Sequence, residues 1–253
     1  SLTPYFLMSS GGIFIVAAKR TPFGAFGGAL TNLSATQLGV ESSKAALAEA
    51  QLDPALIDQC FVGSVLFSPH GAYLARHIAL QSGCSHATPA LTINRLCGSG
   101  FETVIQACNA IQLGQASVVM AGGTESMSQA PLVLNGQDVR FKGSVPLGKG
   151  LQMQDSLWDG LTDSHIKTPM GMTAENLAEQ YNITRQECDE YSIRSQQLHK
   201  AAQDAGFFRD EMAPIQIAGR KGTFTTMDQD EHVRPDSTVE SLAKLKPVFR
   251  KDG

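Results

Sequence analysis

The chain has 253 residues, of which 42% are hydrophobic and 17% charged, with a net charge of -4 and a pI near 5.8. This balance is typical of a globular protein with an apolar core, and it gives no support for broad binding to nucleic acid or to a membrane surface. No stretch approaches the ~20 apolar residues that a membrane helix needs. Five cysteines at irregular spacings, without a CxxC pair, suggest neither a zinc knuckle nor a disulfide framework and favour a reducing compartment.

The first residues look like a tag or a translation remnant rather than a folded element. Met8 stands just before the polar run Ser9-Ser10-Gly11-Gly12, so we expect the natural chain to start at Met8 and residues 1–11 to be a tag or a disordered lead. From Met8 to Val40 there is no acidic residue, which resembles a transit peptide only weakly. Residues 12–18 form a continuous apolar run, which predicts a buried strand covered on both faces.

Strand and helix patterns alternate through the first half of the chain. A helix is expected from Ser34 to about Ala50, with Ser34 and Gln37 as a capping box. The remaining expected elements are strands at 60–67, 90–94 and 116–123, and helices at 73–81 and 100–113. Repeated β-α-β units of this kind indicate an α/β domain with a mostly parallel sheet.

The pattern changes after about Ser128. Residues 131–164 show no clean period, and helices follow at about 173–181 and 184–205, the second with a capping box of Thr184 and Glu187. Short strand-like pieces begin near 214, and a small helix is expected at 239–244. We interpret residues 129–253 as an inserted or appended α+β region.

Cys97 lies between the third predicted strand and the helix that begins near Gly98. A thiol there faces unpaired backbone N–H groups and the positive end of the helix dipole, both of which favour the thiolate. Gly98 and Gly100 suit a sharp strand-to-helix turn, because glycine tolerates unusual torsions and close approach of backbone and substrate. The alternatives are a buried structural cysteine and a dinucleotide loop, although the third glycine of that motif would fall at Thr103.

Several blocks of the sequence together resemble the thiolase family. The blocks lie in order and at family spacing from about residue 13 to the end: Val16-Ala17-Ala18-Lys19-Arg20-Thr21-Pro22-Phe23-Gly24, Thr92-Ile93-Asn94-Arg95-Leu96-Cys97-Gly98-Ser99-Gly100, Gly122-Gly123-Thr124-Glu125-Ser126-Met127-Ser128, Met170-Gly171-Met172-Thr173-Ala174-Glu175-Asn176 and Lys246-Pro247-Val248-Phe249-Arg250-Lys251-Asp252-Gly253. Within the family, the details around Cys97 and at residues 155–158 are most similar to mitochondrial 3-ketoacyl-CoA thiolases.

The resemblance implies an α/β, thiolase-like layered fold. Residues 12–128 would be the amino-terminal core domain, a mixed sheet covered by helices that lacks its last strand. Residues 129–253 would be the α+β loop domain, and the carboxy-terminal core domain would be absent. An open sheet edge of this kind predicts aggregation or partner binding.

The resemblance also implies an acyltransferase. Cys97 would attack the ketone carbon of a 3-ketoacyl-CoA, release acetyl-CoA and pass the shortened acyl group to a second coenzyme A. The family's base histidine, second cysteine and water-holding asparagine come from a carboxy-terminal half that these residues do not contain, so we expect the chain alone to be nearly inactive. One alternative is a truncated, non-catalytic chain that acts only through subunit interaction; a ketoacyl synthase is a poorer third, because its cysteine motif differs.

Coenzyme A would contact the loop region. The family positions that contact the nucleotide and line the pantetheine channel correspond to Arg234, Ser237, Ser241, Leu161, Met170 and Phe249. An arginine suits a phosphate or an adenine face because its planar cation can pair and stack. Without the resemblance, Arg234 would be a solvated surface charge, and Met170 and Phe249 would be core residues.

The remaining expectations concern partners, location and metals. The partners would be coenzyme A thioesters and further copies of the chain in a homodimer or homotetramer, with no nucleic acid, no membrane span and no covalently bound cofactor. The expected role is fatty acid β-oxidation in the mitochondrial matrix, with a peroxisomal or cytoplasmic location as the alternative. No metal is expected, because the spacing of His70, His77 and His86 fits no metal template.

Overall fold

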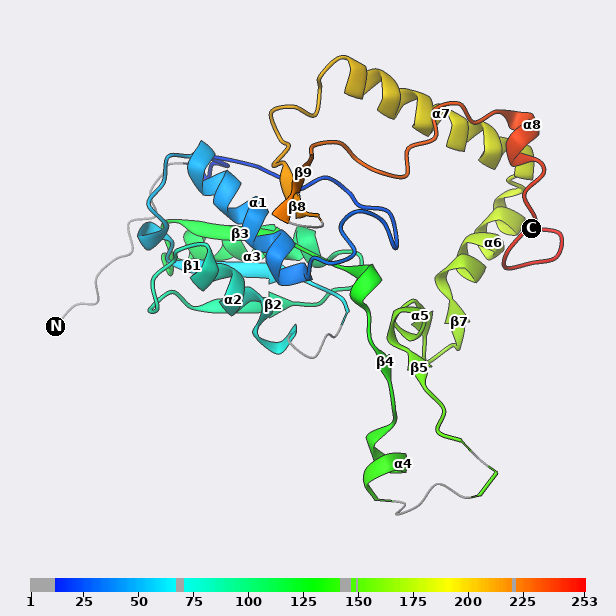
Figure 1. Ribbon diagram of the computed structural model, residues 1–253, viewed down its shortest axis with the longest axis horizontal. Coiled ribbons are helices and arrows are strands. Elements are labelled where there is room, and N and C mark those ends of the chain that lie inside the picture. The colour runs from blue at the N-terminus through cyan, green and yellow to red at the C-terminus, as the bar shows by residue number, and fades with distance from the viewer. Residues whose placement is uncertain (1–11, 67–70, 142–146, 149, 220–221) are drawn as a thin grey trace. The chain divides into compact units, whose positions relative to one another are not determined.

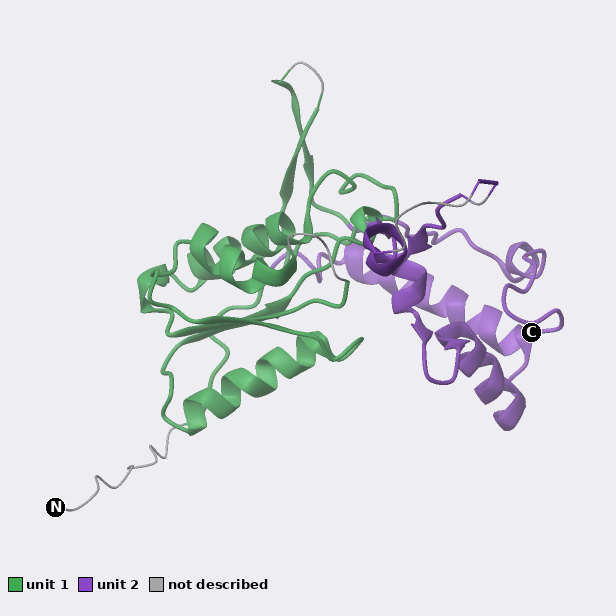
Figure 2. Ribbon diagram, turned by 90° about the horizontal axis from the view of Figure 1, so that it is seen from below, with its two compact units in different colours: residues 1–130, 211–229 green, residues 131–210, 230–253 purple. Residues whose placement is uncertain are grey.

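The computed structural model describes residues 12–66, 71–141, 147–148, 150–219 and 222–253 (Figure 1). They form two compact units. The first unit consists of Ser1–Ala130 with Glu211–Gln229, and the second of Pro131–Asp210 with Asp230–Gly253 (Figure 2). The expectation for residues 1–11 lies outside the described residues.

The first unit is a three-layered α/β structure. Its helices and strands are α1 (Ala35–Glu49), β1 (Gln59–Gly63), α2 (Leu74–Gln81), β2 (Ala90–Ile93), α3 (Ser99–Gln112), β3 (Val119–Gly123), β8 (Ile215–Ala218) and β9 (Phe224–Met227). The central sheet has the order β2-β1-β3, and both pairings are parallel. Helices α1 and α2 cover one face of this sheet and α3 covers the other (Figure 2). The predicted layered α/β fold with parallel strands is therefore confirmed.

Local sequence explains where α1 begins. The Ser34 hydroxyl accepts the backbone N–H of Gln37 at 3.2 Å, and the Gln37 side chain accepts the N–H of Ser34 at 2.9 Å. This confirms the predicted capping box, which supplies partners for groups that an uncapped helix leaves unpaired.

The apolar faces of α1 and α2 pack on β1 around one cluster of buried side chains: Val40, Leu47, Ile57, Cys60, Val62, Leu74, Ala75, Ile78, Ala79 and Cys84.

The strand predicted at residues 12–18 is wrong for the described structure. These residues are extended but outside any strand, and Phe14 and Ile15 are 79% and 82% exposed. A strand needs a neighbour for its backbone N–H and C=O groups, and in the described sheet β3 pairs only with β1. The apolar run therefore remains beside the sheet without joining it.

Residues 211–229 belong to the first unit, although the sequence division placed them with residues 129–253. Arg20 donates its N–H to the carbonyl of Glu211 at 2.8 Å, and its own carbonyl accepts the N–H of Ala213 at 2.7 Å. The hairpin of β8 and β9 then buries Ile215 and Met227 against the loop that leads into α1. Short-range patterns could not show this return, because the contacts join segments about 190 residues apart.

The second unit consists of helices and short hairpins. Its elements are β4 (Leu132–Val133), α4 (Gly136–Arg140), β5 (Gln154–Asp155), α5 (Ser156–Gly160), β6 (Thr162–Asp163), β7 (Thr168–Pro169), α6 (Met170–Tyr181), α7 (Arg185–Asp204) and α8 (Val239–Leu242). The predicted capping box of α7 is confirmed: Thr184 Oγ accepts the N–H of Glu187, whose carboxylate accepts the N–H of Thr184. Within the described ranges, no helix combines the length and apolar character that crossing a membrane requires.

Candidate active site

Cys97 is exposed on the connection between the last residue of β2, Ile93, and the first residue of α3, Ser99. It lies at the carboxyl end of a parallel strand, one residue before the N-cap, Gly98. This is the place that the sequence predicted. A thiol in such a position is reachable by a substrate and lies beside the amino-terminal end of a helix.

Ser99 ties the residues before Cys97 to the start of α3. Its hydroxyl donates to the carbonyl of Leu96 at 2.6 Å and accepts the backbone N–H of Arg95 at 2.9 Å. The backbone N–H of Ser99 also donates to the Leu96 carbonyl, at 3.0 Å. The turn around Cys97 is therefore fixed by a buried side chain on the helix that follows it.

The unusual torsion of the turn lies on Leu96, whose φ is +50°. Gly98 has a φ of -89°, and among the described glycines neither Gly98 nor Gly100 has a positive φ. The expectation that these two glycines supply unusual torsions is therefore wrong. Asn94 explains how a residue with a Cβ adopts this conformation, because its side-chain oxygen accepts the N–H of Leu96 at 3.0 Å in an Asx turn.

Close backbone approach depends on Gly63, at the end of β1. A Cβ on Gly63 would lie 2.7 Å from the carbonyl carbon of Ser99 and 2.8 Å from its oxygen. A Cβ on Gly100, by contrast, would have nothing within 4 Å. Because Gly63 has no side chain, the first turn of α3 can pack directly on the sheet. The Cys97 turn, which immediately precedes α3, is held close to β1 as a result.

An ion pair connects a residue of the Cys97 turn to helix α3. The Arg95 guanidinium pairs with the carboxylate of Glu102, in the first turn of α3, and Gln106 donates to that carboxylate at 2.6 Å. The hydrogen bond from Gln106, followed by that from Arg95, lowers the pKa of Glu102. Glu102 is therefore a charged acceptor that orients Arg95 rather than a proton donor.

The other four cysteines have different surroundings. Cys60 and Cys84 are buried in the first unit, and burial raises the pKa of Cys60 to about 12 and also raises that of Cys84. These two are neutral thiols in the core. Cys108 is half-buried in α3, and Cys188 is exposed on α7. Among the cysteines that the structure describes, only Cys97 is both exposed and located on a strand-to-helix turn.

The residues expected at the pantetheine channel all lie in the second unit. The N–H of Met170 donates to the carbonyl of Leu161 at 3.1 Å, which places these two side by side. Phe249 packs on Gly171, where an added Cβ would lie 2.1 Å from its ring. Leu161, Met170 and Phe249 are 45%, 45% and 40% exposed, so they form an apolar surface. Met170 and Phe249 are therefore not the core residues expected without the family resemblance.

Arg234 and Ser237 lie on the segment that leads into α8, and Ser241 lies within α8 itself. The Ser237 hydroxyl donates to the carbonyl of Arg234 at 2.9 Å, and the N–H of Arg234 donates to Gln196 of α7 at 2.8 Å. Ser241 is engaged in the capping box of α8 with Thr238. The Arg234 side chain is exposed, as a surface that takes a phosphate requires.

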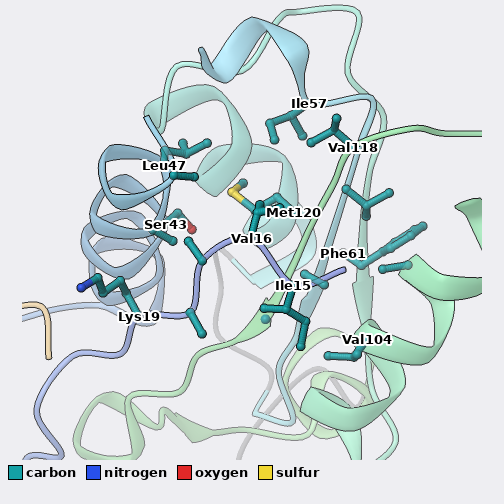
Figure 3. Close-up of a pocket in the computed structure, with 18 of the residues that line it drawn as sticks. Ile15, Val16, Lys19, Ser43, Leu47, Ile57, Phe61, Val104, Val118 and Met120 are labelled. Atoms are coloured by element: carbon teal, nitrogen blue, oxygen red, sulfur yellow. The ribbon is translucent and has the colours of Figure 1, made fainter. Parts of the chain in front are cut away.

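A cavity of about 370 Å³ lies at the edge of β3 in the first unit (Figure 3). Ile15 and Val16 line one side of it, Leu47 of α1 another, and Val104 of α3 a third (Figure 3). Cys97 is not among the residues that line it. This apolar cavity is therefore not the place where the Cys97 thiol would meet a substrate.

The described residues contain no group of three or more His, Cys, Asp or Glu side chains that could hold a metal ion. His77 stacks on Tyr73 with ring centroids 5.6 Å apart. His70 lies outside the described residues, so its expected role is not assessed by this structure.

Sequence reasoning missed three residues of the site. Gly63 ends a strand, Glu125 follows the Gly-Gly exit of β3 and accepts the N–H groups of Val65 and Leu66, and Ser99 stood in the motif without a role of its own. Each acts by contacting another segment of the chain. Gly63 stood inside the strand expected at 60–67, so no local signal marked it, whereas an acidic residue two positions after the strand expected at 116–123 could have indicated Glu125.

Comparison with known proteins places this site in context. The family described as "Thiolase, N-terminal domain" matches residues 13–253. The chain is 53% identical over 243 residues to a human protein named "3-ketoacyl-CoA thiolase, mitochondrial", covering 96% of this chain and 60% of that protein. It is 43% identical to an "Acetyl-CoA acetyltransferase" of Pseudomonas aeruginosa, again over 95% of this chain and 60% of the relative.

Solved structures of two related proteins also match this chain. The crystal structure of human mitochondrial 3-ketoacyl-CoA thiolase in complex with CoA matches with a TM-score of 0.88 and 52% identity, covering 95% of this chain and 59% of that one. The acetyl-CoA acetyltransferase of Bacillus anthracis matches with a TM-score of 0.88 and 40% identity. The chain thus spans about 60% of the length of the relatives that it matches.

Proposed function

The chain belongs to the thiolase family, and we propose that it forms the amino-terminal part of a 3-ketoacyl-CoA thiolase in which Cys97 carries the acyl group. The observation that supports this most is the exposed Cys97 thiol on the turn between β2 and α3. The thiol is accessible, whereas Cys60 and Cys84 are buried and neutral.

The proposed reaction has two steps. The Cys97 thiolate attacks the ketone carbon of a 3-ketoacyl-CoA, the bond between C2 and C3 breaks, and C2 takes a proton as acetyl-CoA leaves. The thiol of a second coenzyme A then loses its proton and attacks the acyl thioester, which releases the Cys97 thiolate and a shortened acyl-CoA. Run backwards, the same steps join two acyl-CoA molecules.

The residues of the first unit would orient the nucleophile. Ser99 fixes the turn, and Gly63 lets α3 pack against β1. The base histidine, second cysteine and asparagine implied by the family resemblance are not among the 253 residues of this chain. We therefore propose that the 253-residue chain alone accepts an acyl group but does not turn over.

Coenzyme A would bind through the second unit. Arg234 offers an exposed planar cation for phosphate or adenine, while Leu161, Met170 and Phe249 offer an apolar surface for pantetheine. The human relative that this chain resembles was crystallised in complex with CoA. We also propose a mitochondrial location, which the names of the relatives support. The homodimer or homotetramer implied by the family resemblance is proposed as well. We propose that the first unit, including residues 211–229, serves as the core domain and the second unit as the loop domain.

The test is acetyl transfer to the purified 253-residue chain. After exposure to acetyl-CoA, peptide mass spectrometry is expected to find an acetyl group on Cys97 and none on Cys188. Cys97→Ala should abolish the mark, and Cys188→Ala should leave it unchanged. An equal mark on Cys188, or one that survives Cys97→Ala, would contradict the proposal.

The coenzyme A surface has its own test. Arg234→Ala should raise the acetyl-CoA concentration that gives half-maximal labelling by about tenfold, the loss expected for a hydrogen bond to a charged group. Arg194→Ala is the matched control, because Arg194 lies over the ring of Tyr191 on α7. Equal shifts for the two variants would count against a specific role for Arg234.

A further inference from the structure

Glu125 directs its carboxylate at one short segment of the first unit. The segment is residues 64–66, which leave the end of β1; we call it the β1 exit segment. Glu125 Oε2 accepts the backbone N–H of Val65 at 2.7 Å and that of Leu66 at 3.2 Å, and Oε1 accepts the Ser64 hydroxyl at 3.2 Å. Glu125 is half-buried, so these bonds are partly shielded from water.

The β1 exit segment in turn contacts the residue before the Cys97 turn. The carbonyl of Val65 accepts a hydrogen bond from Asn94 Nδ2 at 3.1 Å. The other end of the same Asn94 amide, Oδ1, accepts the N–H of Leu96 at 3.0 Å. Hydrogen bonds therefore run without a break from the Glu125 carboxylate to the residue that precedes Cys97.

Leu96 makes this connection important for reactivity. Its φ of +50° is unfavourable for a residue with a Cβ, and such a conformation persists only where neighbouring groups fix it. Asn94 is one of these groups, and its side chain can hold the turn only while it is itself oriented. Because both ends of its amide are used, the Val65 carbonyl decides the orientation.

We propose that Glu125 is a positioning residue for Cys97. It fixes the β1 exit segment, the Val65 carbonyl orients Asn94, and Asn94 sets the left-handed turn at Leu96 that presents the thiol. The proposal rests on the proposed function, since it takes Cys97 as the nucleophile. It gives the acidic residue after the Gly-Gly exit of β3 a role that does not require contact with the substrate.

The chemistry of the site distinguishes the possible substitutions. Glutamine keeps one carbonyl oxygen for the N–H groups of Val65 and Leu66, and its amide can donate to the Ser64 hydroxyl. Alanine leaves both N–H groups without this acceptor. Aspartate keeps the charge but withdraws the carboxylate by one methylene. Glu125→Gln should therefore keep the β1 exit segment hydrogen-bonded, whereas Glu125→Ala should release it.

The experiment measures how fast iodoacetamide alkylates Cys97 in the 253-residue chain. Peptide mass spectrometry gives the rate for Cys97 relative to Cys188, an exposed cysteine in the second unit. The ratio is expected to exceed one in the unsubstituted chain, because Cys97 precedes the amino-terminal end of α3. Glu125→Ala should lower the ratio about tenfold, in line with the cost of a displaced reacting group. Glu125→Gln should restore it, and Glu41→Ala, a change on an exposed position of α1, should not alter it.

A double-mutant cycle tests the route. If Glu125 acts through Asn94, Asn94→Ala alone should lower the ratio, and adding Glu125→Ala should lower it little further. Independent, multiplying effects would overturn the route through Asn94.

The outcomes separate the two proposals. A ratio near one in the unsubstituted chain would contradict the nucleophile role of Cys97. A high ratio that Glu125→Ala leaves unchanged would overturn the positioning role alone. If Glu125→Ala does not fold, Glu125→Asp is measured instead: the expected result is a lower ratio with unchanged thermal unfolding, and an unchanged ratio would overturn the proposal.

Discussion

The two compact units are stabilised in different ways. In the part of the chain that the structure describes, all the buried hydrophobic side chains of the core lie in the first unit, and the buried residue of the second unit is Asp189. Without such buried side chains among its described residues, the second unit relies on helix caps and ion pairs, which the first unit has in addition to its core. Arg185, for example, pairs with Asp189 and donates to the carbonyls of Leu242 and Leu245.

This difference matches what each unit is proposed to do. A nucleophile needs a fixed position, so Cys97 lies on a turn anchored to a packed sheet and helix. A surface that takes a long, partly apolar ligand needs exposed apolar side chains, and the second unit has them at Leu161, Met170 and Phe249. Four predictions test how far the contrast holds.

The largest expected effect is in the core of the first unit. Ile78 is 1% exposed, so Ile78→Ala should lower the free energy of unfolding of this unit by about 2–5 kcal/mol through lost burial and a cavity. Leu177 of α6 is 51% exposed, and Leu177→Ala should change stability by at most about 0.5 kcal/mol. Hydrogen exchange resolved by unit measures both. Similar losses would contradict the contrast between the units.

The next effect concerns the contact beneath the Cys97 turn. Gly63→Ala places a Cβ against the backbone of Ser99 and should cost about 1–3 kcal/mol by overpacking. Gly122→Ala is the matched control on the neighbouring strand, since nothing lies within 4 Å of its added Cβ. Urea unfolding compares the two variants. Equal stability would show that α3 can move away from the sheet without penalty.

A helix cap should contribute the same free energy of stabilisation in both units, because a cap is a local interaction. Thr184→Ala in the second unit and Ser34→Ala in the first each remove a capping box and should each cost about 1 kcal/mol. Amide exchange in the first turns of α7 and α1 reports the loss. A much larger effect at Thr184 would mean that caps, in the absence of a core, stabilise the whole second unit.

The smallest effect is a pH dependence in the first unit. The N–H groups of Val118 and Ser117 hold the pKa of Asp58 below its usual value. The folded pKa is therefore lower than the unfolded value of about 3.9, so the stabilisation is complete above pH ~4 and is lost as the pH falls through the folded pKa. Asp58→Asn should destabilise the unit near neutral pH, and its difference from the unsubstituted chain should shrink below pH ~4. A difference that stays constant from pH 7 to pH 3 in thermal unfolding would contradict this assignment.

Local sequence predicted the elements whose signals are local. The capping boxes at Ser34 and Thr184 and the place of Cys97 between a strand and a helix all depend on residues within a few positions of one another. The apolar run at residues 12–18 was misjudged for the opposite reason. Its residues favour a strand, but a strand also needs a neighbour, and in the described sheet none pairs with it.

The sequence by itself determined the family, the nucleophile candidate and the alternation of helices and strands from α1 to β3, because motifs, caps and hydrophobic periods depend on neighbouring residues. Only the tertiary structure decided that residues 211–229 return to the first unit, that the missing side chain of Gly63 lets α3 pack on the sheet, and that hydrogen bonds connect Glu125 to the Cys97 turn. These contacts join segments that are far apart in the chain. Their energies depend on which backbone groups meet in space, and no local pattern of residue types specifies that.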